Sequence, residues 1–351
     1  MPTITVSPFG ATSAGQCASL YTLTNSHGMS IKVTDFGATL VCILIPRADG
    51  GGHTDVILGF DSAAGYEQTT LYLGATIGRY AGQIKGASLQ LNGKTYPLYV
   101  NDHENTLHGG RKGFDKRLFT AAADAQTNTV SFTYQSPDGE EGFPGNLSVT
   151  SSYQLTDDNR IIMQHTATTD ADTFLNMTNH AYYNLNGHTA GSIENHKLSI
   201  PADHFLELAA DCCPNGRILP TSGTPFDFRT QHTIGERINM PCDQLTRSEG
   251  YDHNWNINGY DGTLRPCASL ENDDGSIKLC LSSDLPGLQM YSGNYLSGAE
   301  PGKDGFAYAH RGALCLEPQF YPAAPAYPNF PSTLLPKNET YHHTLTALFT
   351  Y

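Results

Sequence analysis

The sequence predicts an all-β protein, a large antiparallel β-sandwich with few short helices. Three observations predict it: apolar and polar residues alternate with a period of two along most of the chain, turn signals recur between these runs, and helical spacing is confined to two short segments. The 35 Gly and 20 Pro residues supply the punctuation between strands. Hairpins this frequent are typical of sandwiches and barrels.

In the N-terminal half, strand patterns flank two clear turns. Asn25 to Gly28 forms the first turn, and Asn92-Gly93 forms the second, a two-residue hairpin signal whose central residues take positive φ. The glycines 50–52 fit a hairpin loop, and a short helix is expected over 62–68. The strands expected in this half are 18–24, 30–34, 88–91 and 94–96.

The C-terminal half repeats this hairpin pattern. Thr156 to Asn159 and Asn272 to Gly275 are the expected turns, and a second short helix is expected over 232–239. The aromatic, proline-rich stretch 318–331 fits an ordered loop packed on a sheet. The strands expected in this half are 147–155, 160–168, 268–271, 276–282 and 341–351. Because no internal repeat or low-complexity linker interrupts the pattern, we expect a single domain over residues 1–351.

The charge balance excludes several classes of partner. The chain has 20 basic and 34 acidic residues, a net charge of −14, so neither nucleic acid nor an anionic membrane is an expected partner. The longest apolar run, Leu40 to Ile45, is far too short to span a bilayer. No secretory signal is recognisable at the N-terminus, and the eight cysteines show no metal or redox spacing. We expect a cytoplasmic protein with reduced thiols.

Four short runs carry the residues that could do chemistry. They contain His108 (NTLHGG), His180 (NMTNHAYYNL), Asp252 (GYDHNW) and Glu317 (ALCLEPQ). A lone histidine is more often structural, but together these runs supply amides and carboxylates for hydroxyl groups, aromatic rings for sugar faces, and an imidazole with a carboxylate for acid/base work. No nucleophile elbow, phosphate loop, dinucleotide fingerprint or HExxH zinc motif is present. This combination favours carbohydrate chemistry.

With these runs in place, the sequence resembles the aldose 1-epimerase (galactose mutarotase) family. Matching segments follow in family order from about residue 30 to the C-terminus: GF, IGR, NTLHGG, SPDGEEGFPGNL, LNMTNHAYYNLNG, GYDHNW, PGLQMYSGN and LCLEPQ. The resemblance implies a single-domain β-supersandwich with an open cleft for a monosaccharide, no metal and no organic cofactor. It also implies a monomer or homodimer that interconverts the α and β anomers of a free aldose of the glucose or galactose type.

The resemblance further implies a role for each matching residue. Glu317 would be the catalytic base, His180 the catalytic acid and His108 a second active-site histidine that hydrogen-bonds the sugar. Asp252 and Gln289 would bind hydroxyl groups. The remaining substrate-binding residues would be Arg79, Gly82, Gln83 and Tyr182.

One departure from the family pattern bears on the substrate. The family usually reads Gly-Arg-x-Ala-Asn-Arg, whereas this chain has Gly82 and Gln83 in the places of the last Asn and Arg. An arginine offers a charged fork of donors, whereas glutamine offers a neutral amide. Two alternatives therefore stay open: a non-catalytic carbohydrate-binding relative, or an isomerase of another hemiacetal for which Gly82 leaves room.

Overall fold

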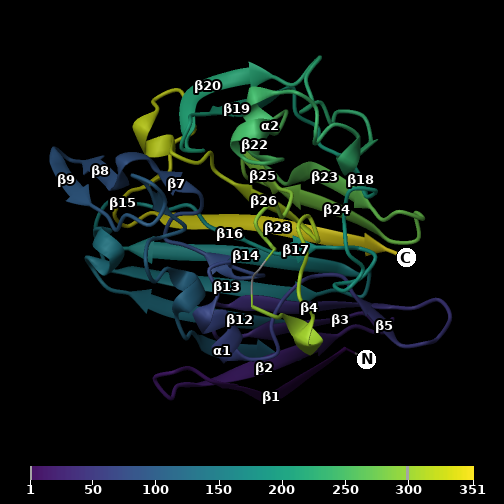
Figure 1. The fold of residues 1–351 in the computed structure, drawn as a ribbon. Helices are drawn as coiled ribbons and strands as arrows, with labels where there is room; N and C mark the ends of the chain where they lie inside the picture. The colour runs from purple at the N-terminus through teal and green to yellow at the C-terminus, as the bar shows by residue number, and fades with distance from the viewer. Residues whose placement is uncertain (1, 298–299) are drawn as a thin grey trace.

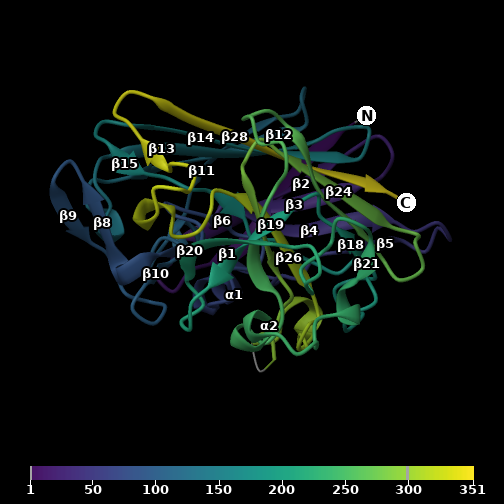
Figure 2. The same cartoon turned by 90° about the horizontal axis from the view of Figure 1, so that it is seen from above.

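The protein is built almost entirely of antiparallel strands, and its two ends lie on the same side of the molecule (Figures 1 and 2). The computed structural model describes residues 2–297 and 300–351. All strand pairs in the three large sheets run antiparallel, as the hairpin-rich sequence predicts. The predicted fold class is therefore confirmed.

The strands are β1 (Thr3–Ala11), β2 (Cys17–Thr24), β3 (Ser30–Thr34), β4 (Thr39–Pro46), β5 (His53–Asp55), β6 (Thr76–Ile77), β7 (Gln83–Ile84), β8 (Ser88–Leu91), β9 (Lys94–Pro97), β10 (Thr106–Leu107), β11 (Thr120–Asp124), β12 (Thr129–Ser136), β13 (Leu147–Leu155), β14 (Arg160–Thr169), β15 (Thr173–Phe174), β16 (Thr178–Asn179), β17 (Tyr182–Tyr183), β18 (Lys197–Ser199), β19 (His204–Leu208), β20 (Pro214–Pro220), β21 (His232–Thr233), β22 (Asp252–Asn256), β23 (Arg265–Glu271), β24 (Lys278–Ser283), β25 (Gly287–Tyr291), β26 (Leu314–Gln319), β27 (Leu334–Leu335) and β28 (Thr340–Thr350). The α-helices are α1 (Ala63–Gln68) and α2 (Asp243–Arg247), and the short 3₁₀ turns are η1 (Lys85–Ala87), η2 (Phe114–Lys116), η3 (Glu140–Gly142), η4 (Ile234–Glu236), η5 (Lys303–Gly305) and η6 (Ala324–Ala326).

Three sheets form the body of the molecule. The N-terminal sheet has the order β1-β2-β3-β4-β5, the largest sheet β11-β12-β13-β14-β28-β24-β23-β18-β21, and the third sheet β17-β26-β25-β22-β19-β20. In the view from above, β14 and β28 lie in one layer and β26 and β19 in another (Figure 2). The C-terminal strand β28 therefore closes the middle of the nine-stranded sheet.

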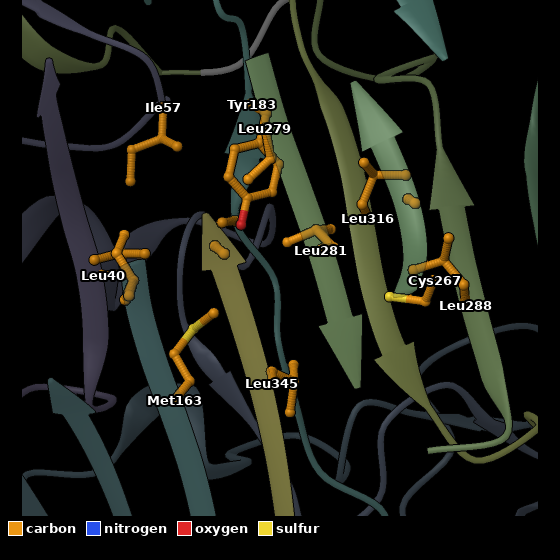
Figure 3. Packing of buried hydrophobic residues seen from close by; sticks show 14 of the residues in the cluster. Leu40, Ile57, Met163, Tyr183, Cys267, Leu279, Leu281, Leu288, Leu316 and Leu345 are labelled. Carbon is orange, nitrogen blue, oxygen red and sulfur yellow. The ribbon is translucent and has the colours of Figure 1, made fainter. Parts of the chain in front are cut away.

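A continuous apolar core fills the space between the layers. It draws buried side chains from Leu23 near the N-terminus to Phe349 near the C-terminus. Figure 3 shows Leu281 and Leu345 of the nine-stranded sheet together with Leu288 and Leu316 of the six-stranded sheet, all pointing into this space. Burial of apolar surface on this scale is the main favourable term in folding.

The period of two decides which residues reach the core. Along β13, buried and half-buried residues alternate strictly, which is the pattern of a sheet with one covered face. In β26 every residue is buried, so both faces of this strand are covered. Its even-numbered residues Leu314 and Leu316 enter the core, and its odd-numbered residues face the opposite side of the sheet. That opposite side carries the candidate site.

The predicted hairpins are found close to their expected bounds, but one element is wrong. Residues 232–239 do not form the expected helix. Instead, His232 and Thr233 form β21 on the edge of the nine-stranded sheet, paired with β18, and only the 3₁₀ turn η4 follows. Pairing with a strand more than 30 residues upstream overrides the local helical spacing here. The α2 helix was not predicted.

Candidate active site

A cleft of about 420 Å³ opens on the outer face of the six-stranded sheet. Strands β17, β26, β25 and β22 form its floor, because they present Tyr182, Glu317, Gln289 and Asp252 on the face opposite the core. Gln289 lies directly opposite Glu317 in the β25–β26 register. The full lining comprises Thr70, Leu71, Tyr72, Gly82, Gln83, Asp102, His103, Leu107, His108, His180, Tyr182, Cys212, Asp252, Gln289, Tyr291, Tyr295, Glu317 and Gln319.

Glu317 and His180 meet at the floor of this cleft. The Glu317 side chain is almost fully buried, and its Oε1 lies 3.7 Å from His180 Nε2. Its other oxygen, Oε2, has no hydrogen-bond partner among the described residues. Burial, with a further contribution from the charge of Asp252, raises the pKa of Glu317 well above its usual value. A carboxylate with a raised pKa and a free oxygen is suited to accepting a proton.

The imidazole of His180 is held between two phenol rings. Tyr182 stacks on it at a centroid distance of 5.1 Å, and Tyr72 stacks at 5.9 Å. Burial lowers the pKa of His180 to about 4, whereas a negatively charged Glu317 beside Nε2 would favour the protonated ring. Its Nδ1 lies 3.5 Å from the Cys315 thiol, which leaves Nε2 to face Glu317.

The same cluster has the composition of a metal site. His180, Cys315 and Glu317 each offer one ligand atom, and these atoms lie within 4.8 Å of one another. However, the thiol approaches Nδ1 of the ring whereas the carboxylate approaches Nε2. A metal ion bound to one nitrogen of the His180 ring would thus lie beside either the Cys315 thiol or the Glu317 carboxylate, but not beside both. We therefore interpret the cluster as a hydrogen-bonded acid/base set.

His108 joins the cluster from a glycine-rich turn. Its ring lies edge-on to His180 at a centroid distance of 5.2 Å. The backbone N–H of Gly82 donates to His108 Nδ1 at 3.1 Å, which leaves the ring proton on Nε2. Burial lowers the pKa of His108 well below its usual value. The following Gly109 has φ of 87°, and a Cβ there would lie 2.1 Å from the carbonyl oxygen of Gly78. The turn therefore requires glycine.

Asp252 and Gln289 face the cleft as a hydrogen-bonded pair. Gln289 Nε2 donates to Asp252 Oδ1 at 2.7 Å. Burial raises the pKa of Asp252 to about 6, the charge of Asp102 adds to this, and the hydrogen bond from Gln289 opposes it. Asp102, Asp252 and Glu317 thus bring three carboxylates to the cleft, and no lysine or arginine stands among its described lining residues.

The structure corrects two expectations for the departure from the family pattern. Arg79 lies outside the cleft, buried with its guanidinium donating to the Oγ and carbonyl oxygen of Ser136 and to the carbonyls of Pro137 and Pro144. Arg79 therefore holds the segment 136–144 in place and cannot supply the sugar contact of the arginine that Gln83 replaces. Gly82 does line the cleft, but a Cβ there would lie 2.8 Å from Pro322 Cβ, so it does not open a larger space.

Gln83 lies in the cleft as expected. Burial raises the pKa of the neighbouring Asp102 carboxyl, and the charge of His103 and the Gln83 side chain oppose this. Sequence reasoning missed Asp102 because nothing local links it to Gln83. It also missed Tyr72, which stacks on His180 across more than 100 residues of sequence, and Gln319. For Gln319 a signal existed, since it stands two residues after Glu317 on the same face of β26.

The cleft combines tyrosine rings with amide and carboxylate groups, a lining suited to a small ligand that has many hydroxyl groups, such as a sugar. The family model described as Aldose 1-epimerase matches residues 19–347, so the chain belongs to the aldose 1-epimerase family. It is 37% identical over 319 residues to a galactose mutarotase of Bos taurus, covering 91% of this chain and 90% of the relative. It is 38% identical over 317 residues to an aldose 1-epimerase of Escherichia coli K12, covering 90% of both chains.

Solved structures agree with this assignment. A crystal structure of an aldose epimerase homologue from C. elegans superposes with a TM-score of 0.87 at 29% identity, covering 95% of this chain and 99% of that one. A crystal structure of galactose 1-epimerase from Lactobacillus acidophilus gives a TM-score of 0.87 at 27% identity, covering 100% and 99%. The predicted family is confirmed.

Proposed function

We propose that this protein is an isomerase that interconverts the α and β anomers of a free aldose through the cleft described above. Family membership over residues 19–347 supports the reaction type. The observation that carries the site assignment is the pairing of Glu317 and His180 at the cleft floor, 3.7 Å apart. One group is suited to accepting a proton and the other to donating one, which is what opening a hemiacetal ring requires.

In the proposed mechanism, Glu317 removes the proton from the anomeric hydroxyl while His180, in its protonated form, donates its Nε2 proton to the ring oxygen and becomes neutral. The C1–O5 bond then breaks, and C1 becomes the aldehyde. Rotation of C1 by 180° about the C1–C2 bond presents its other face, and ring closure returns both protons with the roles of Glu317 and His180 exchanged. His108 would hydrogen-bond a sugar hydroxyl through Nε2, and Asp252 with Gln289 would hold hydroxyls on the far side of the ring.

The charge of the cleft supports a neutral substrate. A sugar phosphate or a uronate would bring its negative charge toward Asp102, Asp252 and Glu317, and the cleft lining provides no described cation to offset it. We therefore propose an uncharged aldose of the glucose or galactose type, and a role in hexose metabolism.

Polarimetry tests this function directly. Freshly dissolved α-D-glucose and α-D-galactose should reach the anomeric equilibrium faster with the protein than in buffer alone, and EDTA should not change the rate. Because the uncatalysed reaction also proceeds, the buffer rate is subtracted. No acceleration for glucose, galactose, xylose or arabinose would contradict the proposal and favour a carbohydrate-binding relative without activity.

Cellular setting and assembly are further proposals. None of the helices in the described residues has the length and apolar character that crossing a membrane requires. The described cysteines are all free, which suits a reducing compartment. We propose a cytoplasmic protein, a monomer or homodimer, folded as one domain around the core that joins residues from both ends of the chain.

A further inference from the structure

Gln319 is a buried amide at the cleft floor with unused hydrogen-bonding capacity. Its side chain is 1% exposed, yet among the described residues neither Nε2 nor Oε1 has a hydrogen-bond partner. Leaving buried polar atoms unpaired costs free energy, so such a group calls for a partner that the protein itself does not supply. Because Gln319 lines the cleft, a bound ligand can be that partner.

A neighbouring amide shows that lack of a partner does not by itself mark a ligand contact, so the position in the cleft must decide. Asn254 is equally buried and also has both amide atoms unpaired, but it does not line the cleft. Gly287 lies opposite Gln319 in the β25–β26 register, and the space beside it is filled, since a Cβ there would lie 2.5 Å from Asn254 Oδ1 and 3.0 Å from Tyr321 Cδ1. What distinguishes Gln319 is therefore its own place in the cleft lining.

The register of β26 fixes which part of a sugar Gln319 can reach. Cys315, Glu317 and Gln319 point to the same face, with about 6–7 Å between successive members along the strand. His180 contacts Cys315 through Nδ1 and faces Glu317 through Nε2, so the proposed acid lies at the Cys315 end of this row. Gln319 lies on the other side of Glu317, away from the acid.

The anomeric carbon is bonded to both the ring oxygen and C2. If His180 holds the ring oxygen and Glu317 the anomeric hydroxyl, C2 is directed toward the Gln319 end of the row. We propose that Gln319 hydrogen-bonds the C2 hydroxyl and makes the enzyme discriminate at that position. This inference rests on the proposed function, because it takes the roles of His180 and Glu317 from it.

The test compares D-glucose with 2-deoxy-D-glucose in the parent and in Gln319→Leu. In the parent, kcat/KM should favour glucose by about tenfold, the equivalent of one hydrogen bond to a buried amide. In Gln319→Leu the ratio should fall to within about twofold of unity, because glucose loses its contact whereas the deoxy sugar had none. Each rate is divided by the buffer rate for the same sugar, since the two sugars differ in intrinsic reactivity.

Gln289→Leu is the matched control. It removes an amide on the neighbouring strand that pairs with Asp252, so it should lower kcat/KM for both sugars and leave their ratio unchanged. If Gln319→Leu lowers both sugars equally, Gln319 only supports the structure and the inference is overturned. A parent that does not discriminate between the two sugars overturns it as well. Should the leucine variant not fold, as judged by circular dichroism, Gln319→Met supplies the same comparison.

Binding measurements separate this inference from the proposed function. Titration calorimetry gives Kd for glucose and 2-deoxyglucose without any need for turnover. A parent that binds glucose about tenfold more tightly than 2-deoxyglucose but does not accelerate mutarotation would contradict the proposed function and still support the assignment of Gln319. If glucose and 2-deoxyglucose have equal Kd values in the parent as well as in Gln319→Leu, the assignment of Gln319 is contradicted, whether or not the protein accelerates mutarotation.

Discussion

Replacing Asp252 by asparagine should stabilise the protein at neutral pH while weakening sugar binding. The pKa of Asp252 is raised from 3.8 to about 6 in the folded state. A carboxyl whose pKa is higher in the folded than in the unfolded state destabilises the folded protein as the pH rises from the unfolded to the folded pKa. The loss of folding free energy from Asp252 reaches its full value above pH 6. The shift corresponds to about 3 kcal/mol at pH 7.5 and to about half of that at pH 5.

The Asp252→Asn substitution preserves the local geometry because an amide oxygen can accept the same hydrogen bond from Gln289 Nε2. Urea denaturation of the parent and of this variant at both pH values gives the difference in unfolding free energy. Taking the difference between the two pH values cancels contributions that do not titrate. The stabilisation by the substitution should be about 1 kcal/mol larger at pH 7.5 than at pH 5.

Activity should change in the opposite direction. Hydrogen bonds to a charged acceptor contribute about 1.5–3 kcal/mol against about 1 kcal/mol for a neutral one, so KM for glucose should rise about five- to tenfold with a smaller change in kcat. A stability difference that is the same at both pH values would refute the reasoning, because it would mean that Asp252 carries no folded-state penalty.

Three further predictions address the proton-transfer pair, the missing arginine and the buried histidines. Glu317→Gln should lower kcat on the order of 10²–10⁴-fold in polarimetry, as expected for loss of a general base, and a loss of less than about threefold would contradict its role. Gln83→Arg should lower KM for glucose about five- to tenfold if a charged fork reaches the hydroxyls, and an unchanged KM would show that another group already holds them. Burial lowers the pKa of His165 and of His253 to about 3. Below pH 6.5 the unfolded state therefore binds more protons than the folded state. Lowering the pH from 7 to 5 should reduce the free energy of unfolding by about 2 kcal/mol for each histidine. Urea denaturation of the parent and of His165→Gln measures this slope, which the variant should reduce.

The elements that local chemistry determines could be predicted from sequence. The Asn92-Gly93 hairpin and the strands flanking Thr156 to Asn159 follow from turn residues and a period of two. Segment 232–239 could not be predicted in this way, because pairing of β21 with β18 decides its conformation.

The residues of the candidate site also fall into those that sequence motifs predict and those that only packing decides. Glu317, His180, His108 and Asp252 stand in recognisable motifs, and the structure brings all four to one cleft. Whether a motif residue points into that cleft is decided by packing across the chain. Arg79 stands in a motif too, but its guanidinium donates to the carbonyl oxygens of Ser136, Pro137 and Pro144 and so points away from the cleft.

The central place of β28 in the nine-stranded sheet affects how a nascent chain can fold. During synthesis β14 and β24 have no strand between them, because their shared neighbour comprises residues 340–350. Both strands then present unpaired backbone donors and acceptors, the kind of edge that recruits other chains. Early hairpins such as β1–β2 can form as soon as their residues emerge, whereas the large sheet can close only after residues 340–350 have been made. Protection by chaperones would therefore matter most in the interval between emergence of β14 and emergence of β28.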